Sequence, residues 1–389
     1  MMLHVWSSRN RRWLVLGVVA FNLRTALVSV PAVAALLARE LGLSNAAIAA
    51  LTTLPVAAFA VFSLGAPWVV RSFGLDRTLR LTLLALAAGL ALRGLGGAAL
   101  LFAGTALAGV AVALANVLLP GLARRDFGEG AGLATGVYVT AFAGGATVAG
   151  ALTAPLAEAT GLGWRLGLAF WSLPAIAAVL VLFAARGDDA DAPVQPPRAA
   201  PALAREPLAW ALLVFLGAQS FVFFTFIAWL PAVLQSHGYS AQAAGLYLSL
   251  SQLICIPAGF VFPQIVFRAR RRTPFVLVMV GATAGGLLGL LLAPTASPAL
   301  WALLVGFGAT AFPIGLTLVV LGSGSRAATD SLSSFAQSGG YLLAATGPLL
   351  AGLIHDASGD WEGAVVMLLV AVVPLGVSGA IAARSRSVL

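Results

Sequence analysis

The sequence predicts an all-α integral membrane protein, with twelve transmembrane helices in two pseudo-symmetric six-helix bundles. The 389 residues are 60% hydrophobic and only 9% charged, whereas a soluble domain carries about 25% charged residues. Apolar runs of about 20 residues, long enough to cross a bilayer, recur along the whole chain. One long polar break, RGDDADAPVQPPRAAPALARE at 186–206, separates six of these runs from the other six.

Short polar segments separate the expected spans. The first run follows a basic stretch, as in a signal peptide, but its length of about 25 residues exceeds a signal region of about 7–15. We therefore expect it to remain as the first helix. The expected spans are 13–37, 45–70, 78–97, 99–122, 130–157, 166–185, 208–235, 241–267, 274–293, 299–321, 331–354 and 362–383.

The long break divides the chain into three expected parts: an amino-terminal bundle at 1–186, a cytoplasmic linker at 187–206 and a carboxyl-terminal bundle at 207–389. The linker is rich in Pro, Ala and Asp, a composition that cannot build a packed core. The halves repeat weakly, since AFAGG matches AQSGG and Trp164 matches Trp361. Parallel six-helix repeats of this kind hold their substrate near the membrane midplane, between the halves.

Charge is distributed unevenly along the chain. All 22 basic residues are Arg, and the net charge is +9. With a cytoplasmic amino terminus, the only arginines in outer segments are Arg39 and Arg165, which fits the positive-inside rule. We therefore expect both termini in the cytoplasm and the chain in the cell (plasma) membrane. The rule explains the net charge without nucleic acid. The single Cys255 excludes an intrachain disulfide, and no metal or other cofactor is expected.

Arg24 and Arg93 lie inside expected spans, away from their first residues, while the acidic residues lie in polar breaks or, for Glu362, at the first residue of a span. A charge in the bilayer core costs several kcal/mol, so Arg24 and Arg93 are functional candidates. Arg24 lies about 16 Å into a core about 30 Å thick, which is the midplane. Its planar guanidinium suits a flat anion; alternatively, it bonds to carbonyls and Asn116 to hold the bundle. Arg93 lies nearer the outer surface, where it either snorkels or joins the pathway.

Other polar side chains are also expected at membrane depth. Amides there face either a cavity or a neighbouring helix, and both alternatives remain open. The aromatic run FVFFTFIAW at 221–229 adds a ring that suits a flat substrate. Together with Arg24, the candidate substrate-binding residues are Asn22, Asn116, Tyr138, Gln219, Phe223, Gln252, Gln337 and Tyr341.

Several segments resemble a known family. They are NLR at 22–24, TTLPV at 52–56, NVLLPGLARRDF at 116–127, GLATGVY at 132–138 and the pair Trp164 and Arg165. These segments are similar to the cyanate/2-nitroimidazole transporter branch of the major facilitator superfamily. The resemblance covers the amino-terminal half by motif and the carboxyl-terminal half by architecture. It implies a transporter that works by alternating access, usually as a monomer.

The superfamily's loop signature after the second span is degraded in this sequence. Gly65 is retained, but Val69 stands where the resemblance implies an acidic residue, and Asp76 with Arg77 substitutes only in part. In the next cytoplasmic loop, a run of charged residues forms either a latch or a solvated surface. The candidate pathway or gating residues are therefore Arg93, Arg124, Arg125 and Asp126.

We predict a secondary transporter for a small anionic or planar electronegative solute, such as a cyanate-like or nitrate-like ion or a small carboxylate. Uniport or exchange is favoured, because no Asp, Glu or His lies at membrane depth to relay protons. The alternative is efflux or uptake of neutral planar compounds such as nitroimidazoles or other drugs. Proton coupling is a further alternative, in which a proton travels with the substrate or through His237 or His355. An enzyme is not expected, because the sequence contains no HExxH motif and no phosphate-cradling loop.

Overall fold

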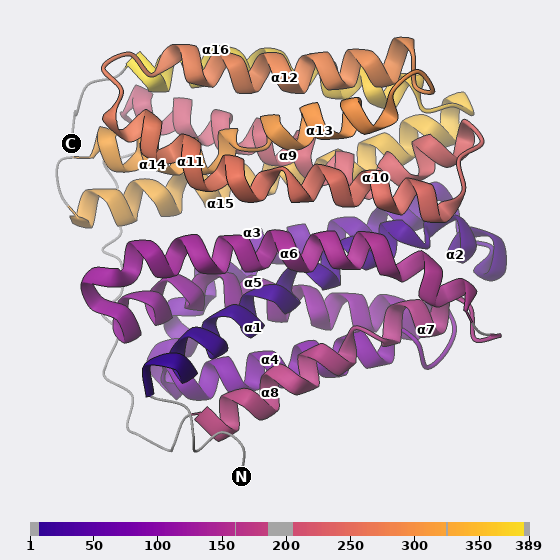
Figure 1. Cartoon of the computed structure of the whole chain (residues 1–389), viewed down its shortest axis with the longest axis horizontal. Helices are drawn as coiled ribbons and strands as arrows, with labels where there is room; N and C mark the ends of the chain where they lie inside the picture. Colours follow the sequence, from indigo (N-terminus) through magenta and orange to yellow (C-terminus); the bar gives the residue numbers. More distant parts are fainter. Residues whose placement is uncertain (1–7, 160, 186–204, 324–325, 385–389) are drawn as a thin grey trace.

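A computed structural model describes residues 8–159, 161–185, 205–323 and 326–384, and the elements in these ranges are helical. Figure 1 shows two layers of long helices. One layer holds the helices of the first half, α1 (Ser8–Ala32), α2 (Ala34–Leu41), α3 (Asn45–Phe73), α4 (Leu75–Leu92), α5 (Ala98–Phe127), α6 (Ala131–Glu158), α7 (Trp164–Ala169) and α8 (Ser172–Ala185). A short 3-10 turn, Gly128–Gly130, joins α5 to α6.

The other layer holds the helices of the second half. They are α9 (Pro207–Ser236), α10 (Ala241–Leu253), α11 (Cys255–Arg268), α12 (Thr273–Leu292), α13 (Pro298–Gly308), α14 (Ala311–Gly322), α15 (Arg326–Ser358) and α16 (Glu362–Arg384). Most of the expected linker, 187–206, lies outside the described residues. Within the described ranges, nine helical segments are long and apolar enough to cross a membrane. The other three expected spans correspond to α3, α4 and α15.

Four expected spans are each broken into two helices rather than continuous. The first span breaks at Val33, just after Pro31, between α1 and α2. In the other three, a proline lies four residues after the last residue of the first helix or its cap. A proline nitrogen cannot donate to the carbonyl four residues earlier, so the ladder of hydrogen bonds is interrupted there. These pairs are Phe170 and Pro174, Leu253 and Pro257, and Ala309 and Pro313.

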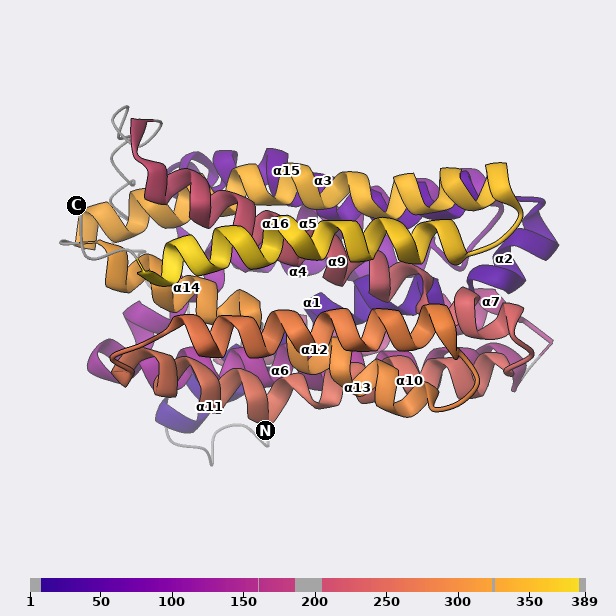
Figure 2. The ribbon, with the colours of Figure 1, turned by 90° about the horizontal axis from the view of Figure 1, so that it is seen from above.

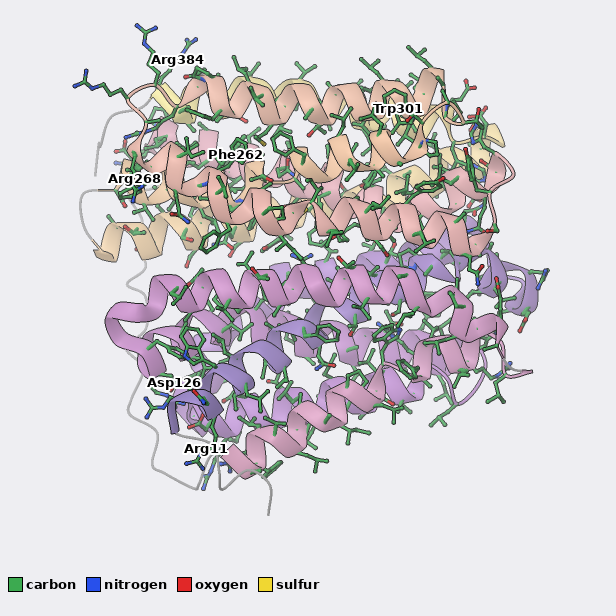
Figure 3. All side chains as sticks on the ribbon, viewed as in Figure 1. Arg11, Asp126, Phe262, Arg268, Trp301 and Arg384 are labelled. Atoms are coloured by element: carbon green, nitrogen blue, oxygen red, sulfur yellow. The ribbon has the colours of Figure 1, made fainter. Side chains whose placement is uncertain are left out.

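The two ends of the molecule differ in charge. Figure 3 shows Arg11, Asp126, Arg268 and Arg384 at one end, which we call the terminal end because α1 begins and α16 finishes there. The opposite end, where α9 finishes and α10 begins, is called the far end. Arg11, Arg268 and Arg384 therefore lie on one side of the molecule, consistent with the positive-inside pattern.

Several pairs of helices join the two halves, and three of them make the most extensive contacts. Helix α3 packs on α15, α6 packs on α10, and α1 packs on α9; Figure 2 gives a second view of these layers. At the far end an apolar cluster is continuous across both halves, with Leu37 and Ile48 on one side and Trp229, Ala351 and Trp361 on the other. The halves are therefore closely packed on each other at the far end.

Small residues allow α6 and α10 to approach closely. A Cβ atom added at Gly245 would collide with the Gly150 carbonyl. Ser249 takes part in the same contact, since its hydroxyl donates a hydrogen bond of 2.7 Å to the Thr147 carbonyl. Small residues and a cross-helix hydroxyl bond are the usual means by which membrane helices associate. The α6–α10 contact thus joins the halves backbone to backbone.

Candidate functional site

The guanidinium of Arg24, on α1, contacts aromatic rings from both halves. Phe142 of α6 lies 5.7 Å away within the first half, and Phe223 and Phe224 of α9 lie 5.6 Å and 5.7 Å away in the second half. Such cation–π contacts stabilise by up to about 2 kcal/mol when they are desolvated. The Arg24 Nη1 atom is buried and has no hydrogen-bond partner. Arg24 therefore lies where the two halves meet, and its Nη1 group remains able to donate a hydrogen bond.

Two weakly polar groups of the second half face Arg24. The Tyr341 hydroxyl of α15 and the Cys255 thiol, at the start of α11, both interact with it electrostatically. The thiol also donates to the carbonyls of Ser251 and Gly306, at 3.3 Å and 3.2 Å. In the described part of the chain, no carboxylate is an electrostatic partner of Arg24. The protein therefore leaves the charge of Arg24 without a counter-ion.

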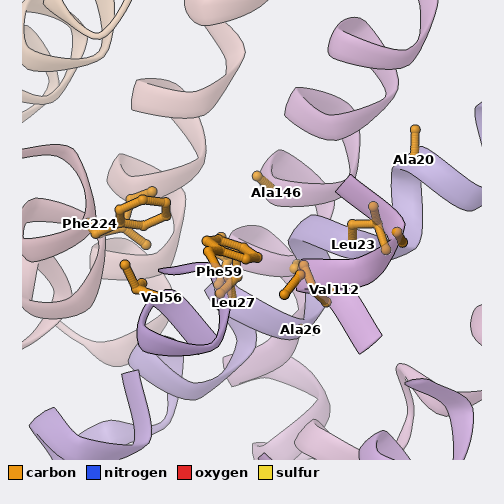
Figure 4. Close-up of a cluster of buried hydrophobic side chains, with 14 of the residues drawn as sticks. Ala20, Leu23, Ala26, Leu27, Val56, Phe59, Val112, Ala146 and Phe224 are labelled. Carbon is orange, nitrogen blue, oxygen red and sulfur yellow. The ribbon is translucent and has the colours of Figure 1, made fainter. Parts of the chain in front are cut away.

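A network of rings extends outward from Arg24. Tyr341 lies 5.4 Å from Phe59 of α3, 6.4 Å from Phe224 and 6.4 Å from Phe312 of α14. Figure 4 shows Phe59 and Phe224 facing each other from the two halves, with centroids 6.2 Å apart. On the opposite side, Tyr138 packs edge-on against Phe142 at 5.4 Å. We use the name Arg24 cluster for Arg24, Tyr138, Phe142, Phe223, Phe224 and Tyr341.

Four of the residues that the sequence singled out meet in the Arg24 cluster. They are Arg24, Tyr138, Phe223 and Tyr341, and the side chains of all four are half-buried. Tyr138 interacts electrostatically with Tyr341 across the halves. Half-buried groups on α1, α6, α9 and α15 that converge at one depth are the arrangement expected of a site between two bundles.

The two candidate asparagines of the first half lie outside the Arg24 cluster. Asn22 is 1% exposed, and its amide donates to the carbonyls of Val18, at 2.8 Å, and Pro174, at 3.1 Å. It therefore ties α1 to α8 within the first half. Asn116 is half-buried and donates to Val112, four residues earlier on its own helix, at 3.0 Å. The alternative in which Asn116 holds Arg24 is not the arrangement found.

The three candidate glutamines of the second half also lie outside the cluster. Gln219 is 2% exposed in α9, and its side-chain oxygen has no partner. Gln252 donates to the Ser251 hydroxyl at 3.0 Å. Gln337 donates to the Ser333 hydroxyl, one turn earlier on α15, at 2.7 Å. The last two amides are thus held by serines of their own helices.

The chain is similar to known transport proteins. Residues 13–342 match the profile of the Major Facilitator Superfamily. The chain belongs to the major facilitator superfamily. It is 36% identical to the 2-nitroimidazole transporter of Escherichia coli (strain K12) over 98% of both chains. It is 29% identical to the Cyanate transport protein CynX of the same organism, over 90% of this chain and 91% of that one.

A solved structure supports the same fold. A bacterial homologue of the human lysosomal transporter Spinster, in an inward-facing and unoccupied conformation, superposes with a TM-score of 0.79 at 16% identity. The match covers 97% of both chains. The twelve-helix prediction and the resemblance to the cyanate/2-nitroimidazole branch are therefore confirmed. The chain is a multi-pass secondary transporter with a small-molecule substrate, and it is not an enzyme.

The position of Arg93 corrects one expectation from the sequence. We expected this arginine either to snorkel or to join the pathway, but in this superfamily member it is 0% exposed. Its Nη1 donates to the Ala26 carbonyl at 2.8 Å and lies 3.5 Å from the Ser29 hydroxyl. Arg93 caps α4, whereas Ala26 and Ser29 belong to α1; its buried Nε and Nη2 have no hydrogen-bond partner. It therefore fastens α4 to α1.

At the terminal end, Arg125 pairs with acidic residues of α4 and α5. It makes a bidentate pair with Asp76, with both contacts at 2.9 Å, and a further contact of 3.0 Å with Asp126. Arg12 donates to the Asp126 carbonyl at 3.1 Å. The charged run thus links α1, α4 and α5 within the first half. The side chain of Arg124 lies outside the described residues.

Sequence reasoning missed Phe142, Phe224 and Cys255. Phe142 follows Tyr138 by four positions, so the helical period places both on one face, and this signal was available. Phe224 lies beside Phe223 in an unbroken apolar run, where spacing does not show which ring points inward. Cys255 is the first residue of α11 and lies two residues before Pro257. The proline predicts a break at the centre of this span, and that break is the signal that could have pointed to Cys255.

Proposed function

We propose that the chain carries a small anionic or planar electronegative solute across the membrane, with Arg24 as the principal contact. The observation that carries the proposal is the uncompensated charge of Arg24, whose Nη1 has no partner between the two halves. A buried charge without a counter-ion is costly, so a ligand that brings a negative charge is favoured there. The names of the related nitroimidazole and cyanate transporters support a planar, electronegative cargo.

Transport would proceed by rocking of the two halves around the Arg24 cluster. The packing of Trp229 and Trp361 at the far end supports a state closed on that side. The arginines gathered at the terminal end support a cytoplasmic position for both termini. The proposed working unit is a monomer; light scattering of the purified protein would overturn this part if it gave twice the chain mass.

Uniport or exchange is the proposed mode of transport. The two histidines that offer a proton route lie at the far end, away from the Arg24 cluster. His355 stacks on Trp361 with centroids 4.0 Å apart, and the His237 ring bonds to the Val233 carbonyl at 2.8 Å. Uptake into pH-clamped liposomes should not require an imposed proton gradient, after correction for substrate protonation. Strict dependence on that gradient would contradict uniport and exchange alike.

The second candidate is transport of neutral planar compounds such as nitroimidazoles. The rings of Phe142, Phe223 and Phe224 favour it, because aromatic side chains bind flat molecules whether or not these carry a charge. The two candidates differ in their dependence on Arg24. Binding of an anion requires the guanidinium, whereas binding of a neutral ring depends mainly on the aromatic side chains.

Thermal shifts of the purified full-length protein would test the proposal. A ligand that binds the folded state raises the apparent melting temperature by mass action. Small anions and neutral nitroimidazoles should be compared on wild type, Arg24→Ala and Arg24→Lys. Arg268→Gln is the matched control, because it removes an exposed arginine of the terminal end. We expect anions to stabilise wild type and the control, with affinity reduced by about 30-fold or more in Arg24→Ala. Equal shifts in Arg24→Ala would contradict the proposal.

A further inference from the structure

The polar groups around Arg24 are few, and the apolar groups are many. Within the described residues, the electrostatic partners of Arg24 on the second half are Tyr341 and Cys255. The rings of Phe142, Phe223 and Phe224 lie 5.6–5.7 Å from its guanidinium carbon. The site therefore offers one cation, the guanidinium of Arg24, and the weak donors of Tyr341 and Cys255. Aromatic rings lie beside these groups.

Four side-chain amides that could add hydrogen-bond donors to the site already donate to other acceptors. Asn22 donates to carbonyls of α1 and α8, and Asn116 donates to its own helix. Gln252 and Gln337 are held by neighbouring serines. A small inorganic anion that leaves water needs donors on every side, because each unreplaced hydrogen bond is lost affinity. Besides the guanidinium, the described residues of the Arg24 cluster and its surroundings supply only the weak donors of Tyr138, Tyr341 and Cys255.

A ligand with one charged edge and one apolar ring matches this arrangement better than a small inorganic anion does. Aromatic rings gain from edge-on and offset contacts with other rings, beyond the area that they bury. A single guanidinium balances a single carboxylate, which it binds through two parallel hydrogen bonds. A second carboxylate would meet Phe224 or Phe59, both of which are buried among apolar groups.

We propose that the preferred substrate is an aromatic monocarboxylate. Its carboxylate pairs with Arg24, its ring lies between Phe142 of the first half and Phe223 of the second, and its far edge faces Tyr341. The inference rests on the proposed anion site and narrows it, because it ranks aromatic acids above inorganic anions and above saturated acids of the same size.

The position of Tyr341 extends the inference to substituents on the ring. Its side chain is packed among Phe59, Phe224 and Phe312, while its hydroxyl remains within electrostatic range of Arg24. A polar substituent opposite the carboxylate would meet this hydroxyl. Removal of the hydroxyl in Tyr341→Phe should therefore weaken binding of a para-hydroxylated acid and leave the unsubstituted acid unaffected.

Benzoate and cyclohexanecarboxylate provide the decisive pair of probes. They carry the same charge and have nearly the same size, but only benzoate has a π system. Equilibrium binding of both, and of nitrate and cyanate, should be measured on the purified full-length wild type, Phe223→Leu and Phe142→Leu. Phe262→Leu is the matched control, because Phe262 packs on Phe307 in the second half, outside the Arg24 cluster.

We expect wild type and Phe262→Leu to bind benzoate about tenfold more tightly than cyclohexanecarboxylate, as several ring contacts would produce. The ratio should fall towards one in Phe223→Leu and Phe142→Leu. Equal affinity for both acids in wild type would overturn the aromatic preference and leave the anion site intact. Binding of nitrate or cyanate alone would do the same. If no anion binds and only neutral nitroaromatics do, both this inference and the anion site fail.

Discussion

The carboxylate of Asp356, near the end of α15, accepts a hydrogen bond of 2.7 Å from the side-chain amide of Asn45, at the start of α3. Its second oxygen accepts from the backbone N–H of Ala46 at 2.9 Å. A helix start leaves such donors without partners, and a carboxylate there is further favoured by the helix dipole. A residue of the second half thus caps a helix of the first, and the cap joins the two halves at the far end.

Loss of this cap should open the far end more often. In Asp356→Ala, two hydrogen bonds to a charged acceptor disappear, worth on the order of 1 kcal/mol at an exposed position. Cys255 is the only cysteine of the chain and faces Arg24, so its alkylation reports access to the central site. A membrane-impermeant thiol reagent applied to the far side should react about fivefold faster.

The matched control for the cap is Asp360→Ala. Asp360 is exposed on the same connection, but its bonds reach only Ser358 and Glu362. We expect its alkylation rate to equal that of wild type. If Asp356→Ala and Asp360→Ala react alike, the cap does not hold the far end closed.

Gly352 should tolerate no side chain while the far end is closed. A Cβ atom there would lie 2.9 Å from the Ala49 Cβ, 3.0 Å from the Asn45 carbonyl and 3.1 Å from Trp229. Gly352→Ala should lower the apparent melting temperature, since overpacking costs about 1–3 kcal/mol. Gly259→Ala is the control, because nothing lies within 4 Å of its added Cβ. Equal melting temperatures for the two variants would show that the contact relaxes freely.

Arg93 should matter for stability but not for ligand choice. Its side chain is fully buried and bonded to the Ala26 carbonyl, so Arg93→Ala loses that bond and leaves a cavity. We expect a loss of about 3 kcal/mol, seen as a lower apparent melting temperature. Arg93→Met should be milder, because it fills the space and removes a buried charge. Ligand affinity should be unchanged in both variants; a loss as large as in Arg24→Ala would place Arg93 in the pathway.

The Asp76–Arg125 pair should contribute modestly to the free energy of unfolding. Its side chains are 14% and 31% exposed, and its geometry is bidentate. A double-mutant cycle of Asp76→Ala and Arg125→Ala should give a coupling of about 1 kcal/mol in thermal or denaturant unfolding. Additive effects of the two substitutions would show that the pair is not energetically linked.

Much of the fold could be predicted from local signals. Runs of apolar residues give the spans because the bilayer fixes their length. The breaks inside four spans were not predicted, although three of them lie four residues before a proline and follow from its missing N–H. Arg24 could be recognised because a charge at the membrane midplane is costly and therefore indicates a function. Tyr138 and Tyr341 could be recognised because they are polar and lie at a similar depth.

The amides show where sequence reasoning fails. An asparagine at membrane depth must satisfy its N–H groups, but the sequence does not show which acceptor it chooses. Asn116 uses the carbonyl four residues earlier, and Asn22 uses that acceptor and another on α8. Arg93 is a similar case, because its partners, Ala26 and Ser29, lie on another helix, α1, and become visible only when the helices are packed.

Initial rates of benzoate uptake into proteoliposomes, for wild type, Arg24→Ala and Arg268→Gln at equal folded protein, test the central claim most directly. The account predicts that wild type and Arg268→Gln take up the anion at similar rates and that Arg24→Ala falls to the rate of protein-free liposomes. Uptake by Arg24→Ala at the wild-type rate would show that the guanidinium between the two halves does not bind the substrate.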